Sequence, residues 1–391
     1  MKIKKIIIPI ICSMMFSGCW DNVEIDKKTF VSVIGVDVSK DINNEDVIKK
    51  LKPDDPFQET DIKRIQVTYG FPDLSQLGPN KQGTAKDKYL LSESSTMQDS
   101  LSKASVKTSR DIFLGQTKLL ILSSRIMEKK EIVKEIIDYL QRNPRVNKAM
   151  YVALSEDRAE DIIKFKPITE NNIETYISGI MENSKRNSTV LPVTLNELLI
   201  LLDTNNNAII PTVKLDKDKN EISMSGTSII KDYTLKGKLT SVETSDIEMI
   251  RGKIIGGKKV IYKDGKPIEF VIEKGDRKLN ISKQGDKLKI DVKVKLEGQI
   301  EQYYLTPNLM NVATINDLQT DFDKSLSDEC NETAKLIQNQ YKVDPMELRE
   351  NVEKYHPKIW NQVKDNWEEA FKSADINVDV KTYIRRIGSA E

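Results

Sequence analysis

The residues of this chain with the most distinctive chemistry are three cysteines and one histidine. With a single imidazole, that of His356, we expect no histidine-based triad, no His–Cys dyad and no multi-histidine metal site. The cysteines Cys12, Cys19 and Cys330 show no Cys-x-x-Cys zinc pattern. We therefore predict no catalytic residue, no metal site and no cofactor, and the chemistry that remains is modification of a cysteine.

Cys19 follows a segment with the order of a secretory signal peptide. Three lysines in the first five residues precede an apolar run from Ile6 to Phe16, and the small residues Ser17-Gly18 stand directly before the cysteine. The run is too short for a membrane-spanning helix, which takes about 20 apolar residues. This order resembles the bacterial lipobox, in which the cysteine sulfur receives diacylglycerol, although Phe16 replaces the usual leucine.

We predict a lipoprotein signal peptide at residues 1–18 and lipidation of Cys19. The alternative is an ordinary cleaved signal that leaves Cys19 as a free thiol. With Cys12 removed and Cys19 acylated, Cys330 has no partner, so no disulfide is expected within the mature chain. Any attachment to a membrane then runs through Cys19.

Charge and loop patterns exclude several functions. Lys plus Arg (61) against Asp plus Glu (60) gives a net charge of +1, so no overall field draws the chain to nucleic acid. The segment 216–220 resembles the first half of a calcium loop, but Glu221 stands where the turn needs glycine and Thr227 where a bidentate glutamate belongs. The glycines form no phosphate-binding loop, and no Gly-x-Ser-x-Gly motif supports a hydrolase.

The sequence pattern of residues 19–215 predicts an N-terminal α+β region. Thr194 and Glu197 form a capping-box pattern before an apolar helix. We expect residues 209–213 to be an edge strand, because Pro211 cannot donate to a ladder. The other predicted strands cover residues 29–38, 62–69, 89–92, 118–122 and 148–154, and the other helices begin after Thr96 and cover 128–141, 157–165 and 173–184.

The sequence pattern of residues 216–391 predicts a second α+β region that begins with strands. Residues 288–296 alternate apolar and charged side chains, as in a half-buried antiparallel strand. A long helix at 315–341 carries Cys330 on its apolar stripe. Hairpin signals occur at Asp264-Gly265 and Gly285-Asp286. Further predictions are strands at 222–231, 253–262, 268–273, 278–282 and 376–382, a short helix starting at Asp344-Pro345, and a helix after Pro357 with Trp360, Trp367 and Phe371 on one face.

Several separated motifs resemble the Ger(x)C family, the C-subunit lipoproteins of spore germinant receptors. They occur in the family's order and cover most of the mature chain. The sequence departs from the family at Gln116 and Asn143, where a histidine and an acid are usual. The matching motifs are Cys19-Trp20-Asp21-x-x-Glu24-Ile25, the strand ending Gly35-x-Asp37, Arg142-Asn143-Pro144, Gln340-Tyr341-x-x-Asp344, Pro357-x-x-Trp360, Trp367-x-x-x-Phe371 and Ile384-Arg385-Arg386-x-Gly388.

The resemblance implies three α+β domains and a receptor subunit without enzymatic activity, held by Cys19 on the outer face of the spore inner membrane. It also implies two integral-membrane partner subunits, of the A and B type. Two other classes stay open on the residues alone: a surface-anchored hydrolase, and a solute-binding lipoprotein of a transporter. The run of strands followed by helices in the second half favours α+β over the repeated β-α-β lobes of a solute-binding protein.

Overall fold

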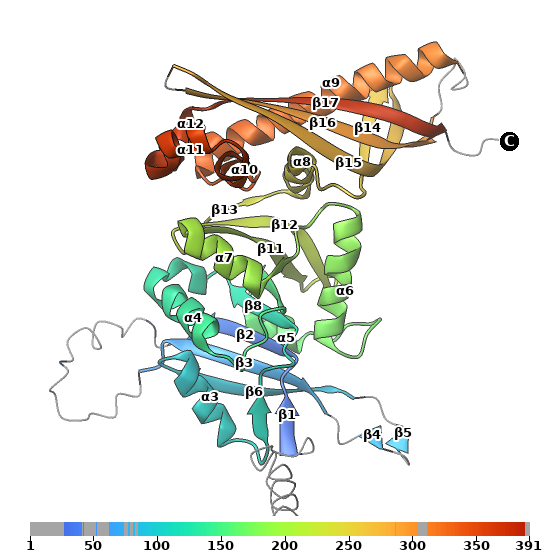
Figure 1. The fold of residues 1–391 in the computed structure, drawn as a ribbon. Coiled ribbons are helices and arrows are strands. Elements are labelled where there is room, and N and C mark those ends of the chain that lie inside the picture. The colour runs from blue at the N-terminus through green and yellow to red at the C-terminus, as the bar shows by residue number, and fades with distance from the viewer. Residues whose placement is uncertain are drawn as a thin grey trace, which may run out of the picture.

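The computed structural model describes residues 27–387 except 41, 43–51, 53–61, 74–76, 79–80, 83–84, 286 and 304–310. Within these residues two main sheets lie one above the other, with nine strands in the first and four in the second (Figure 1). We call residues 27–239 the N-terminal module and residues 241–387 the C-terminal module. Both combine a sheet with packed helices, which confirms the predicted multi-domain α+β fold.

The sheet of the N-terminal module is parallel at its centre and antiparallel on both sides. Its described strands follow the order β13-β12-β11-β9-β8-β2-β3-β6, and β10 (Val193–Thr194) pairs with β9. The parallel strands are β2 (Val33–Val38), β8 (Leu119–Ser123), β9 (Tyr151–Ser155) and β11 (Asn207–Asp216). The antiparallel strands are β3 (Ile65–Pro72), β6 (Asp87–Ser94), β12 (Glu221–Lys231) and β13 (Thr234–Leu239).

Helices cover both faces of this sheet and create two cores. Leu120 and Leu122 of β8 point into one core, and Leu119 and Ile121 point into the other. The continuous apolar run predicted as a buried strand is therefore confirmed, because both of its faces are covered. The first core takes α3 (Met97–Ser105), α4 (Lys130–Arg142) and α7 (Leu195–Asn205), and the second takes α5 (Ala159–Lys164) and α6 (Ile173–Arg186).

Helix starts were predictable from local signals. The Thr96 hydroxyl accepts a hydrogen bond from the backbone N–H of Asp99 at the start of α3. Thr194 and Glu197 form the expected reciprocal capping box at the start of α7. These short-range bonds satisfy N–H groups that no earlier turn can reach, so they depend little on the rest of the fold.

The prediction that residues 209–213 form an edge strand is wrong. Strand β11 lies inside the sheet, between β9 and β12. Pro211 is tolerated there because the β11–β12 register shifts between Pro211 and Val213, and because the parallel pairing with β9 uses only Thr212 and Val213. A proline at such an irregularity removes no ladder hydrogen bond.

The chain between the two regions contains more structure than we expected. The division proposed after residue 215 falls at the turn between β11 and β12, and β12 and β13 continue the same sheet. A helix that we did not predict follows, α8 (Ser241–Arg251). Its signals were present: Thr240 and Glu243 form a capping box, and Gly252 ends the helix with a φ of 66°.

The sheet of the C-terminal module has the order β14 (Lys258–Lys263), β15 (Lys266–Gln284), β16 (Lys287–Gln302) and β17 (Asp375–Ile387). The hairpin at Asp264-Gly265 is confirmed, since both residues have positive φ and β14 pairs antiparallel with β15. The prediction of two strands at 268–273 and 278–282 is wrong, because β15 runs unbroken through Gly275, with two shifts in its register against β16 before that residue. A Cβ at Gly275 would collide with Ile254 and Leu296, so this glycine permits close packing and does not end a strand.

The start of one strand and the pairing direction of another differ from the prediction. The strand expected from residue 253 begins only at Lys258, because residues 253–257 form a loop against the end of α6, where a Cβ at Gly256 would collide with the Arg186 carbonyl. Strand β16 pairs antiparallel with β15, as expected, but parallel with β17. A parallel neighbour cannot be inferred from alternation within one strand.

Helix α9 (Val312–Leu336) lies in the hollow of the four-stranded sheet (Figure 1) and ends in a π-helical turn, η5 (Ile337–Tyr341). Its apolar stripe is buried as predicted, with Leu318, Phe322, Leu326 and Cys330 each at most 2% exposed. On the β14 side, Lys259 and Lys263 form ion pairs with Glu329 and Asp321 of the helix.

A series of polar side chains on α9 satisfies the free edge of β17. They are four residues apart on the helix, and the strand N–H groups they bind are two residues apart. Four helical residues rise about 6.0 Å and two strand residues about 6.6 Å, so the two spacings nearly match. The N–H groups of Ile384, Thr382, Val380 and Val378 donate to Gln319 (2.9 Å), Asp323 (2.6 Å), Ser327 (2.9 Å) and Asn331 (2.9 Å).

The last helices are α10 (Leu348–Tyr355), α11 (Pro357–Val363) and α12 (Trp367–Ser373). The short helix predicted from Asp344 begins four residues later, after a turn that Asp344 stabilises. A 3-10 turn, η6 (Lys364–Asn366), divides the predicted tryptophan helix. The Trp360 and Trp367 rings are still 5.9 Å apart between centroids and pack at the edge of the core, as the spacing predicted.

We predict that Asn331→Ala lowers the free energy of unfolding by about 1–3 kcal/mol, because it removes two hydrogen bonds to Val378 and leaves their backbone partners unsatisfied. Asp328→Ala, on the exposed face of the same helix, is the matched control and should change stability by less than about 0.5 kcal/mol. Urea denaturation of both variants provides the measurement. Equal effects at the two positions would show that the strand edge does not depend on α9.

Candidate functional site

Cys19, predicted to carry a lipid, lies outside the described residues, so its modification stays a prediction. Cys330 is fully buried, and burial raises the pKa of its thiol well above the ordinary value, which makes it unreactive. His356 ends α10, and its carbonyl accepts the N–H of Trp360 in α11. In the described part of the chain, no group of three or more His, Cys, Asp or Glu side chains could hold a metal ion.

A groove of about 330 Å³ lies between the two modules and is the candidate binding site. One wall comes from the end of α6, from α7 and from the start of β11. The other wall comes from α8 and from the turn between η5 and α10. Charged side chains of both signs surround an apolar lining that includes Leu191, Val193, Leu201, Ile209, Val343 and Pro345.

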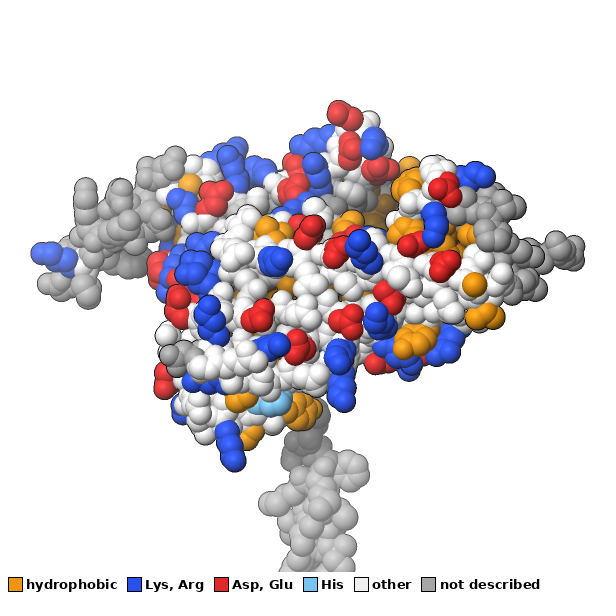
Figure 2. All heavy atoms as spheres, turned by 90° about the horizontal axis from the view of Figure 1, so that it is seen from above, with side chains coloured by type: hydrophobic (Ala, Val, Ile, Leu, Met, Phe, Trp, Pro, Cys, Tyr) orange, Lys and Arg blue, Asp and Glu red, His pale blue; other side chains and the backbone are white. Residues whose placement is uncertain are grey.

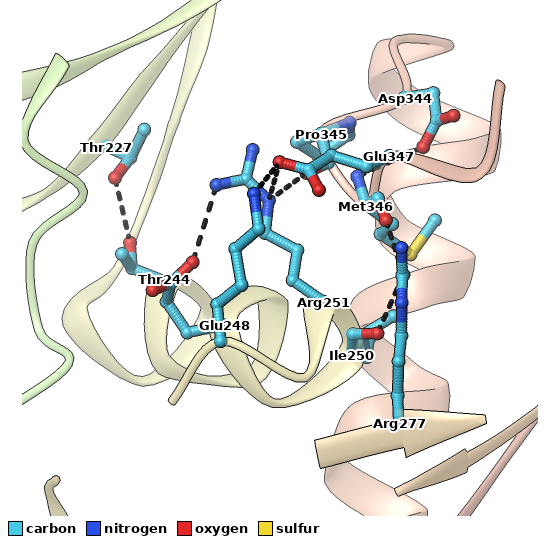
Figure 3. Close-up of polar contacts among 11 residues, drawn as sticks. Thr227, Thr244, Glu248, Ile250, Arg251, Arg277, Asp344, Pro345, Met346 and Glu347 are labelled. Atoms are coloured by element: carbon cyan, nitrogen blue, oxygen red, sulfur yellow. Dashed lines mark hydrogen bonds and ion pairs between the residues drawn. The ribbon is translucent and has the colours of Figure 1, made fainter. Parts of the chain in front are cut away.

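Two arginines hold the turn that forms the C-terminal wall of the groove (Figure 3). Arg251, at the end of α8, donates from Nε to the carbonyl of Pro345 at 2.6 Å. Arg277 of β15 donates from one Nη1 to the carbonyls of Ile250 and Met346, at 2.9 and 2.7 Å. Arg277 therefore joins three segments that are far apart in the sequence, and it fixes the turn relative to α8.

The acidic groups beside this turn are engaged by the chain itself. Asp344 is half-buried at the groove, and its carboxylate accepts the backbone N–H groups of Met346 (3.0 Å) and Arg349 (2.7 Å). Burial, with a contribution from the nearby Glu350, raises the pKa of Asp344 to about 7. Glu347 pairs with Lys253 at 2.6 Å. These carboxylates stabilise the turn and the start of α10.

A second buried carboxylate, Asp246 of α8, lies between α8 and α9. It is fully buried and accepts a 2.6 Å hydrogen bond from the Thr333 hydroxyl. Burial and the neighbouring Glu329 raise the pKa of Asp246 to about 8, and Lys259, which pairs with Glu329, opposes that rise. Asp246 thus favours its protonated, neutral form in the folded protein.

The third buried carboxylate, Asp37, lies near the carboxyl end of β2. Open α/β sheets commonly bind ligands beyond the carboxyl ends of their parallel strands. Here Asp37 accepts the N–H groups of Ala159 (2.8 Å) and Glu160 (2.9 Å), so the chain's own carboxylate occupies the start of α5. Gly35 permits this contact, because a Cβ there would collide with Ile163. The Gly-x-Asp motif is therefore structural.

The shape of the groove would allow it to bind a ligand and hold it in position. Among the described residues, however, we find no nucleophilic side chain beside a base that is free to take its proton. The sequence reasoning missed Arg251, Arg277 and Asp246 because it missed α8 and divided β15. The capping box at Thr240 and Glu243 was the signal that could have revealed α8. None of the described helices combines the length and the apolar character that crossing a bilayer takes.

The fold is that of a multi-domain α+β protein with a groove between its two modules. The family model "Spore germination protein N-terminal domain" matches residues 21–215, and "Spore germination B3/ GerAC like, C-terminal" matches residues 225–388. The chain belongs to the Ger(x)C family of spore germination proteins, as its motifs indicated.

The chain is similar to known spore germination proteins over nearly its whole length. The chain is 25% identical to Bacillus subtilis "Spore germination protein YndF", with 98% of this chain and 96% of the relative covered. It is 23% identical to "Spore germination protein B3" of the same organism, with 95% and 94% covered. The crystal structure of the GerBC protein has the same fold, with a TM-score of 0.59 and 21% identity over 84% of this chain and 96% of that chain.

The raised pKa of Asp246 predicts a specific pH dependence of stability. The folded protein holds a proton on Asp246 that the unfolded chain releases near pH 4, so the contribution of Asp246 to stability should fall as pH rises from about 4 to about 8. Asp246→Asn keeps a neutral group at this position. Between pH 5 and 8 the free energy of unfolding should therefore fall less in the variant than in the wild type, by at least about 1 kcal/mol, since one pKa unit corresponds to about 1.4 kcal/mol. Asp328→Asn, an exposed change on α9, is the control. Parallel pH profiles for wild type and Asp246→Asn, from urea unfolding, would contradict the assignment.

Proposed function

We propose that the chain is a lipid-anchored, non-enzymatic subunit of a spore nutrient germinant receptor. Lipidated Cys19 holds it on the outer face of the spore inner membrane, beside two integral-membrane subunits of the A and B type. Membership of the Ger(x)C family and the names of its relatives, which are spore germination proteins, support this proposal. Its role is in assembling the receptor and in the response to nutrients.

The non-enzymatic part of the proposal rests on the buried carboxylates. A catalytic acid needs a perturbed pKa and access to a substrate. Asp37, Asp246 and Asp344 have raised pKa values, but each carboxylate is held by backbone N–H groups or by a hydroxyl of the chain. Their perturbed pKa values follow from burial in the structure and need no catalytic role.

The anchor is tested by Cys19→Ala. Labelled fatty acid should enter the wild-type protein and not the variant, and the variant should leave the membrane fraction in cells that lack both partner subunits. Several acyl chains hold a protein stably, whereas one chain binds only with a K of about 10⁴ M⁻¹. Cys330→Ala is the control and should still be labelled, because that thiol is buried. Failure to label the wild type would remove the anchor from the proposal.

The assembly role is tested in spores. Trp367 contacts both Trp360 and Phe371, and Trp→Ala changes in a core typically cost about 3–5 kcal/mol, so Trp367→Ala should lower the level of folded subunit. Nutrient germination should then fall in proportion, while a trigger that bypasses nutrient receptors still works. Trp367→Phe, which keeps an aromatic ring, is the matched control. The measurement combines nutrient germination with immunoblots of all three subunits, and full nutrient germination in spores lacking this chain would refute the role.

A further inference from the structure

One end of the N-terminal module combines basic side chains with an exposed apolar residue. Residues 103–110, at the end of α3 and in the following turn, include Lys103, Lys107 and Arg110 and contain no acidic residue. Val106, at the centre of this stretch, is 85% exposed. Lys107 and Arg110 are exposed as well. We call residues 103–110 the basic tip.

The basic tip lies beside the start of the described chain. Strand β7 (Asp111–Phe113) directly follows the tip and pairs in parallel with β1 (Lys28–Phe30), so Lys28 lies opposite Asp111. The Lys28 ammonium is 5.0 Å from the centre of the Phe113 ring. Figure 1 shows the end of α3 together with β1 at the bottom of the molecule, at the opposite end from β14–β17.

The position of β1 limits which end can face a membrane, provided that the proposed lipid is on Cys19. Eight residue steps separate Cys19 from Lys27, the first described residue. A fully extended chain spans at most about 3.6 Å per residue, so Lys27 cannot be farther than about 29 Å from the acylated sulfur. The end of the molecule that carries β1 and the basic tip is therefore the end held near the bilayer.

We propose that the basic tip rests on the membrane as a docking surface for anionic phospholipid, with Val106 entering the headgroup layer between Lys107 and Arg110. The proposal rests on the anchoring at Cys19 and adds an orientation to it. Basic residues next to an anionic leaflet are each worth about a fivefold gain in membrane partition, and an apolar side chain between them adds buried area. The charges suit this occupant: Asp99 is paired with Lys103 at 3.1 Å, and Asp111 lies opposite Lys28 in the register of β1 and β7.

Elsewhere on the described surface, basic and acidic side chains are mixed. On the face seen from above in Figure 2, basic and acidic side chains of the described residues are interspersed. Across the outer side of the C-terminal sheet, Lys293 lies opposite Asp379, and Glu297 pairs with Arg385 at 2.9 Å. Such a mixed surface has little attraction for an anionic leaflet, so docking through the basic tip leaves the C-terminal module facing away from the bilayer.

The test uses the mature chain from Trp20 with an N-terminal hexahistidine tag, held on vesicles that contain a nickel-chelating lipid. This tether replaces the acyl anchor, so the outcome does not depend on lipidation of Cys19, which the fatty-acid labelling tests separately. Cysteines are introduced singly as Val106→Cys and, at the far end, Val312→Cys, and are labelled with acrylodan. Val312 is 70% exposed, and the native Cys330 is buried and does not react.

On vesicles rich in phosphatidylglycerol, we expect the emission of the label at position 106 to shift to shorter wavelength, and the label at 312 to behave as in solution. On phosphatidylcholine vesicles the shift at 106 should be much smaller. Lys107→Gln with Arg110→Gln should lower the docked fraction, with the docking equilibrium weakened about 25-fold for two basic residues. Lys324→Gln with Lys335→Gln, two exposed lysines on α9, makes the same change in charge at the far end and should have no effect.

Three outcomes would overturn the docking surface. The labels at 106 and 312 could give the same spectra on anionic vesicles, the shift at 106 could be equal on neutral vesicles, or the two glutamine pairs could have equal effects. Circular dichroism and urea unfolding of each variant confirm that it is folded, and these exposed substitutions should change stability by less than about 0.5 kcal/mol.

Discussion

The free edge of β17 is the constraint on which the C-terminal module depends. An uncovered strand edge presents unpaired N–H groups, and such an edge invites pairing with other chains. Helix α9 meets this requirement with Gln319, Asp323, Ser327 and Asn331, while its apolar stripe fills the sheet. One helix therefore both supplies the core and closes the edge.

The need to give every buried polar group a hydrogen-bond partner also explains the acidic groups inside the molecule. A buried carboxylate is costly unless donors surround it, and it otherwise takes up a proton. Asp37 receives the N–H groups at the start of α5, and Asp344 receives those before α10. Burial and the neighbouring Glu329 raise the pKa of Asp246, and the hydrogen bond from the Thr333 hydroxyl only partly opposes that rise. Perturbed acids can mark catalytic sites, but in this chain they mark places where one element is joined to another.

The modules meet through α8 and through a turn that two arginines hold. Arg277 binds carbonyls from α8 and from the turn, and Ser188, after α6, donates to the carbonyl of Gly256 at 2.9 Å across the junction. Planar guanidinium groups with several donors suit such junctions, because they bind carbonyls from different segments at once. The groove between the modules thus has walls whose relative position is set by hydrogen bonds.

The sequence by itself determined the elements whose signals are local. The alternation in β16, the three-to-four spacing in α9 and the capping residues of α7 fixed their type and their buried faces, and the ordered motifs fixed the family. Only the tertiary structure decided that β11 is internal, that β15 passes through Gly275, and that Arg251, Arg277 and Asp246 form the junction. Periodicity shows which side chains are covered but not which element covers them. Strand neighbours and buried ion partners are chosen by contacts between residues far apart in the chain, and no local pattern records those contacts.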